Sequence, residues 1–172
     1  MLKVSGLNKL KKPINPKKNA KYEVTVDEYL TKRDYTGALT LLEFKLKGQD
    51  GDIKDLLMWI GYCAFHLGNF RRAESAYKQM IDTNLAGPEI HLYLACCYFY
   101  QEIYDDALKE CELSPNNSLK NRLLFNIYHR TGDEKKLLAQ HQFLKDTKED
   151  QLSLAAVHFL RSHYQEVRRI LM

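Results

Sequence analysis

Apolar residues recur along most of this chain at steps of three and four, which is the spacing of one face of an α-helix. In residues 57–67 this face comprises Leu57, Ile60, Gly61, Ala64 and Leu67. Strictly alternating patterns, which are typical of half-buried strands, are scarce. The pattern of hydrophobic and polar positions therefore predicts an all-α protein.

Two stretches of this helical pattern repeat each other at a fixed distance. Ala73 and Ala107 are 34 positions apart, and so are Gly61 and Ala95, which stand twelve residues before them. Small residues at two helix-packing positions with a period of 34 residues are the signature of the tetratricopeptide repeat (TPR). Such repeats stack into extended binding surfaces.

The same template continues in both directions. Ala38 stands 35 residues before Ala73, while Leu137 and Val167 follow Ala107 at successive intervals of 30 residues. The shorter interval predicts a change of superhelical pitch after Pro115. We predict a TPR α-solenoid over residues 22–172, with about four helix pairs of which the last is incomplete.

Each predicted pair needs close contact between its two helices. Residues with little or no side chain allow that approach, and an aromatic residue then fills the space between layers. The repeat-packing positions predicted in this way are Ala38, Gly61, Ala73, Tyr77, Ala95 and Ala107. One pair cannot bury its apolar face alone, so neighbouring pairs must cover it.

Charge is distributed unevenly along the chain. Residues 1–21 contain seven lysines and no acidic residue, and the remainder carries a net charge of about −3. We expect residues 1–21 to be a disordered, solvated leader; an electrostatic contact with tubulin tails, nucleic acid or lipid headgroups is the alternative. A nucleic-acid partner is disfavoured because this segment lacks interleaved aromatic residues. No apolar run approaches the ~20 residues needed to cross a bilayer, so we expect no membrane insertion.

The reactive residues form no catalytic or metal-binding motif. Cys63, Cys96, Cys97 and Cys111 include no CxxC pair and no histidine at zinc-ligand spacing, so we interpret them as buried free thiols. Nucleotide-binding glycine loops and hydrolase motifs are absent. We therefore expect a protein without enzymatic activity, cofactor or small-molecule substrate.

A partner-binding groove is expected on the first helix of each pair. Its candidate residues are Tyr62, His66, Tyr100, Arg122, Asn126 and Arg130. The last three are spaced by four, so they share one helix face, and Arg and Asn can hold a carboxylate through charge-assisted hydrogen bonds. One hypothesis is that they bind an acidic segment of a partner; the alternative is a solvated face paired with nearby Glu or Asp.

Six strings in this chain are more specific than the repeat pattern. They are LLEFK at 41–45, WIGYCAFHLG at 59–68, NRLLF at 121–125, DEKKL at 133–137, KEDQLSLA at 148–155 and RSHYQE at 161–166. In this order they resemble the N-terminal region of the intraflagellar transport protein 56 family, over about residues 24–167.

The resemblance implies a scaffold subunit of the ciliary transport B complex that supports cilium assembly and carries cargo, including motility components. Its implied partners are other subunits of that complex and ciliary cargo proteins. Its implied location is the cilium or flagellum and the ciliary base, with a cytoplasmic pool. The alternative functions are a co-chaperone-type adaptor for acidic peptides and a nucleic-acid-binding module.

The sequence departs from that family in length. Family members are considerably longer and continue with further repeats, whereas this chain stops at Met172. Without a polar capping helix, the last pair is expected to expose an apolar edge. We therefore expect the isolated chain to self-associate through this edge.

Overall fold

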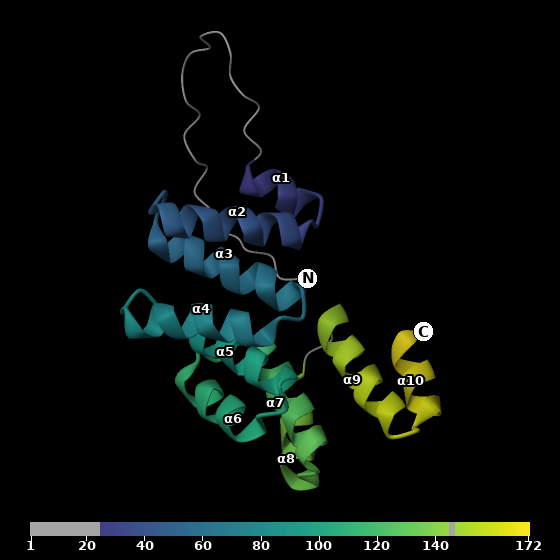
Figure 1. Cartoon of the computed structure of the whole chain (residues 1–172). Coiled ribbons are helices and arrows are strands. Elements are labelled where there is room, and N and C mark those ends of the chain that lie inside the picture. The colour runs from purple at the N-terminus through teal and green to yellow at the C-terminus, as the bar shows by residue number, and fades with distance from the viewer. Residues whose placement is uncertain (1–24, 145–146) are drawn as a thin grey trace.

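The computed structural model describes residues 25–144 and 147–172, and these residues form ten helices (Figure 1). The expected lysine-rich leader, residues 1–21, and the expected boundary at residue 22 lie outside the described residues. The helices are α1 (Val26–Thr31), α2 (Tyr35–Gly48), α3 (Ile53–His66), α4 (Phe70–Asp82), α5 (Glu89–Tyr100), α6 (Tyr104–Leu113), α7 (Ser118–Thr131), α8 (Glu134–His141), α9 (Lys148–Leu160) and α10 (Tyr164–Leu171).

Successive helices pack in pairs, α1 with α2 through to α9 with α10, and the pairs stack along the chain. The predicted all-α TPR solenoid is confirmed. The count differs, because the described residues form five pairs rather than about four. The sequence pattern marked the second helix of the first pair at Ala38 but missed the first one, because α1 has only six residues, none of them buried, which is too short for a clear period.

The same turn joins the two helices of every pair. At each turn one residue has a left-handed backbone, with φ between 56° and 76°. Those residues are Arg33, Gly68, Glu102, Gly132 and Ser162. In three turns the next residue caps the second helix with its side chain: Asp34, Asn69 and Asp133 each accept a hydrogen bond from a backbone N–H three residues on. This geometry recurs even where glycine is absent.

The core of the solenoid depends on a close approach of α3 and α4. Gly61 lies buried against the ring of Tyr77, and a Cβ on Gly61 would overlap that ring. All six predicted repeat-packing residues are buried. One continuous core runs from Ala38 in α2 to Ile127 in α7. This core holds the first three pairs and α7 together.

The packing between pairs becomes weaker after Pro115, where α6 meets α7, and its pattern changes at the last pair. At the first three boundaries the second helix of one pair packs on the first helix of the next, as α6 does on α7, but at the last boundary the main contact is between α7 and α9. A second, smaller core of Phe125, Leu137 and Val157 joins these helices. The fifth pair is therefore attached through α7.

The described residues contain no helix that is long and apolar enough to cross a bilayer.

We predict that Gly61→Ala destabilises the protein by about 1–3 kcal/mol, because the added methyl group forces the Tyr77 ring out of its place. The matched control is Gly48→Ala at the end of α2, where no atom lies within 4 Å of an added Cβ. It should be neutral or stabilising by up to ~1 kcal/mol. Urea unfolding followed by circular dichroism measures both.

A double-mutant cycle tests the cause. Gly61→Ala with Tyr77→Cys reproduces the combination Ala95 and Cys111 that the next pair holds at the equivalent positions. The two substitutions together should cost less free energy of unfolding than the sum of the single changes. Strict additivity would contradict a steric contact between these two positions.

Candidate functional site

Six rings from the first three pairs form a continuous surface, which we call the aromatic strip. Its members are Tyr35 from α2, Trp59, Tyr62, Phe65 and His66 from α3, and Tyr100 from α5. Helix geometry places three of these rings together. Trp59, Tyr62 and His66 stand at steps of three and four residues and so share one face of α3.

The rings of the aromatic strip contact one another in sequence. The ring centroids of Trp59 and Tyr62 are 5.4 Å apart, and those of Tyr62 and His66 are 4.4 Å apart. His66 also stacks on Tyr35, with centroids 4.9 Å apart and planes inclined by 14°. These distances lie within or close to the range of favourable ring pairs.

The strip continues to the third pair through Phe65, whose ring lies 5.4 Å from that of Tyr100. Tyr100 in turn stacks on Phe70, with centroids 4.8 Å apart and an interplanar angle of 12°. Tyr100 is nevertheless 56% exposed, and His66 is also exposed. The strip thus offers partly fixed aromatic faces to a ligand, which lowers the entropy cost of binding.

Burial keeps the strip uncharged near neutral pH. It lowers the pKa of His66 below its ordinary value of 6.5. Burial, reinforced by Tyr35, also raises the pKa of Tyr62 above 10.0. Both side chains therefore present neutral rings at pH 7.

The remaining groove candidates lie on α7. Arg122 donates through Nη1 to Oδ1 of Asp150 at 2.9 Å, and that carboxylate is only 1% exposed. Asn126 donates through Nδ2 to the backbone oxygen of Arg122 at 2.8 Å. Arg130 is exposed. The structure thus brings Tyr62, His66 and Tyr100 together through ring contacts, whereas Arg122 binds a carboxylate of its own chain.

The Arg122–Asp150 ion pair joins α7 to the first turn of α9. Arg161, which caps α9, reinforces this junction by donating through Nη2 to Oε1 of Glu134 at 2.8 Å. The sequence offered pairing with Glu or Asp as the alternative for Arg122 but did not identify the partner of either arginine, since the partners are 28 and 27 residues apart. Arg122 therefore stabilises the stacking of the last pair, and its capacity to bind an external acid is reduced.

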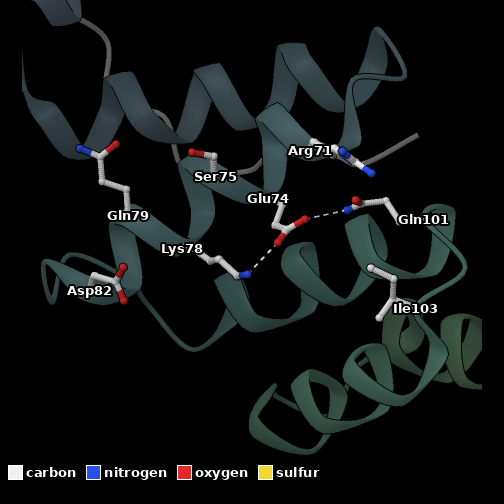
Figure 2. A pocket seen from close by; sticks show the side chains of 8 residues that line it. All are labelled: Arg71, Glu74, Ser75, Lys78, Gln79, Asp82, Gln101 and Ile103. Atoms are coloured by element: carbon white, nitrogen blue, oxygen red, sulfur yellow. Dashed lines mark hydrogen bonds and ion pairs between the residues drawn. The ribbon is translucent and has the colours of Figure 1, made fainter.

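A polar hollow of about 640 Å³ lies between α4 and the end of α5, and sequence reasoning missed it (Figure 2). Glu74 stands at its centre and accepts hydrogen bonds from Lys78 Nζ at 2.7 Å and from Gln101 Nε2 at 2.8 Å. Partial burial opposes ionisation, but these two bonds outweigh it and lower the pKa of Glu74. The ionised carboxylate of Glu74 thus links the second pair to the third through its hydrogen bond with Gln101.

The four cysteines lie apart from this chemistry. Cys63, Cys97 and Cys111 are buried, and Cys96 is partly buried. Burial raises the pKa of Cys63 and of Cys111 to about 11. Because the thiolate is the reactive form, these thiols are inert near neutral pH. Within the described part of the chain, no three His, Cys, Asp or Glu residues are placed to hold a metal ion.

Comparison with known proteins identifies relatives of this sequence. A family model described as intraflagellar transport protein 56 matches residues 57–172. The curated intraflagellar transport protein 56 homolog of Caenorhabditis elegans is 38% identical over 152 residues, which is 87% of this chain and 26% of that protein. Intraflagellar transport protein 70A of Xenopus tropicalis is 23% identical over 154 residues, 87% of this chain and 23% of that protein. This chain therefore spans about a quarter of the length of these relatives.

Two solved structures share the fold. One is TTC0263, a thermophilic TPR protein of Thermus thermophilus, with a TM-score of 0.67 and 19% sequence identity over 84% of each chain. The other is MamA, with a TM-score of 0.64 and 16% identity over 87% of this chain and 91% of that one. At such identities the likeness supports the TPR fold alone.

We predict that Asp150→Ala destabilises the protein by about 3–5 kcal/mol, because it leaves the Arg122 guanidinium without its carboxylate in a nearly dry site. Arg130→Ala, at an exposed position on α7, the helix of Arg122, is the control and should change the free energy of unfolding little. Chemical denaturation measures both variants. If Asp150→Ala lowers the free energy of unfolding by less than about 1 kcal/mol, the ion pair does not hold the last pair in place.

Proposed function

Because this chain belongs to the intraflagellar transport protein 56 family, we propose that it is a non-enzymatic scaffold subunit of the intraflagellar transport B complex. It binds other subunits and ciliary cargo, motility components among them, and so supports cilium assembly. It acts in the cilium or flagellum and at the ciliary base, with a cytoplasmic pool. The observation that carries the binding part of this proposal is the aromatic strip.

The aromatic strip has the character of a protein-binding surface. Tyr and Trp are enriched at interfaces, and a few such residues carry most of the binding energy. Tyr100 and His66 are the exposed members, and their rings are braced by neighbouring rings. A partner segment lying across α3 and α5 would cover these faces and exclude water from them.

The alternative, a co-chaperone-type adaptor that binds acidic peptides, rests on Arg122, Asn126 and Arg130. It is less favoured because Asp150 occupies the guanidinium of Arg122. Arg130 alone offers a point charge at an exposed position, where ion pairs contribute little.

We predict that tagged chain purified from ciliated cells recovers intraflagellar transport B subunits, detected by mass spectrometry. A variant carrying His66→Ala and Tyr100→Ala should recover these subunits about tenfold less, because it removes the exposed rings of the strip. Phe44→Ala is the matched control, an aromatic residue on α2 that is 74% exposed and outside the strip. Melting curves confirm that each variant folds.

The same purification separates the alternatives. Arg130→Glu should leave recovery of the subunits unchanged under the scaffold proposal. Recovery of chaperones alone, abolished by Arg130→Glu, would instead favour the acidic-peptide adaptor. Full recovery of the transport subunits by the variant with His66→Ala and Tyr100→Ala would show that the binding surface lies outside the aromatic strip.

The last pair carries a second exposed surface. Leu152, Phe159 and Leu160 share one face of α9 and are 55–61% exposed, and Tyr164 on α10 packs edge-on against Phe159. Soluble proteins rarely leave such faces uncovered. We propose that this face contacts a second copy of the chain when the chain is isolated.

We predict that the purified chain is at least dimeric at high concentration by light scattering, because association buries this face. Leu152→Glu with Phe159→Glu should return it to a monomer by placing charges in the contact. Leu138→Glu on α8, where the leucine is 71% exposed, is the matched control and should not. A wild-type monomer at high concentration would refute self-association.

A further inference from the structure

Exposed acidic side chains occupy equivalent positions near the starts of α3 and α5, 34 residues apart. Asp55 stands one helical turn before Trp59 on the same face of α3, and it is exposed. Glu89, the first residue of α5, is exposed too. Neither carboxylate takes part in an ion pair that the described residues form. Asp55 therefore places an available carboxylate beside a neutral aromatic face, and Glu89 places a second one at the corresponding point of the next pair.

Charge is separated along the chain on a larger scale. Residues 25–113, which form the first three pairs, contain 15 acidic and 9 basic residues, a net charge of −6. Residues 114–172 contain 6 acidic and 10 basic residues, a net charge of +4. The aromatic strip belongs to the acidic part, so a basic ligand would be attracted to it.

The chain itself contains a segment of matching chemistry. Residues 11–18 read KKPINPKK, with two prolines flanked on each side by two lysines, and residues 1–21 hold no acid. Proline-rich segments are bound by aromatic-lined grooves, because proline rings stack on aromatic faces and lose little entropy. Lysine ammonium groups are attracted to the faces of Trp and Tyr rings and to carboxylates.

Reach and tethering favour this occupant. Lys11 and Lys18 precede Thr25 by 14 and 7 residues, which reach roughly 48 and 24 Å when extended. The 14 residues of α3 cover only about 21 Å. A tethered segment meets a nearby site at an effective concentration on the order of millimolar, so weak contacts suffice.

We infer that residues 1–21 of this chain bind across the aromatic strip, with their prolines on the rings and their lysines at Asp55 and Glu89. The inference rests on the proposed function in one respect, since the strip is the surface proposed there for partners. The segment then regulates that surface, because a partner must displace it. Loss of the segment should therefore raise the affinity for any partner that binds the strip.

Carbodiimide cross-linking of the purified full chain tests the contact, because this reagent joins only amines and carboxylates that touch. Mass spectrometry should find Asp55 or Glu89 joined to a lysine of residues 11–18. Lys78 and Glu74, 2.7 Å apart, are the internal positive control for the reaction. A sample with the control cross-link and none from residues 1–21 would overturn the inference.

Mixing isotope-labelled and unlabelled chains shows whether the lysines at Asp55 and Glu89 come from the same chain or from a second copy. The inference requires cross-links within one chain only. Cross-links of mixed isotopic composition at the same carboxylates would show that a second copy supplies the lysines, and would overturn the intramolecular contact.

Trp59 gives an independent readout, since it is the single tryptophan of the chain. Replacing Lys11, Lys12, Lys17 and Lys18 by glutamate should raise acrylamide quenching of its fluorescence about twofold. The same four positions changed to arginine are the matched control and should leave quenching at the wild-type level. Unchanged quenching in the glutamate variant would overturn the inference.

Both measurements use the chain without any partner, so their failure leaves the proposed scaffold function untouched. Conversely, failure to recover transport subunits from cells would not affect an observed cross-link to Asp55 or Glu89. The two proposals can therefore fail separately.

Discussion

The close packing of two helices at a residue without a side chain is the constraint on which the rest of this structure depends. Gly61 lets the Tyr77 ring lie directly against the backbone of α3. With the ring accommodated there, α3 and α4 form a pair that is apolar on both outer sides. Neighbouring pairs must cover those sides, and the result is a stack rather than a separate domain for each repeat.

This arrangement also explains why an aromatic surface is available. The small residues of α3 face α4, so the larger rings of that helix occupy its other face. There Trp59, Tyr62 and His66 brace one another and the neighbouring Tyr35. Burial lowers the pKa of His66 and keeps this face neutral, although the first three pairs, residues 25–113, carry a net charge of −6.

The pairs are linked by apolar contacts and by a few charged hydrogen bonds of unequal burial. Arg72 reaches Glu43 at the first boundary, and Gln101 reaches Glu74 at the second. Among the described residues, such a contact between pairs is nearly excluded from water only at the last pair, where Arg122 meets Asp150. The smaller apolar core there gives this ion pair a greater share in holding the stack. A side chain on the expected binding face is consequently used for stability.

The sequence by itself determined the helical class, the repeat and the repeat-packing positions, because these depend on contacts within one repeat that spacing records directly. It also gave Tyr62, His66 and Tyr100 as candidates for a binding groove, while their ring contacts are visible only in the structure. Tertiary structure alone decided that five pairs are present in the described residues, that α9 packs on α7, and that Asp150 takes the Arg122 guanidinium. Contacts between repeats depend on how the pairs stack, and the residues that meet there carry no fixed spacing.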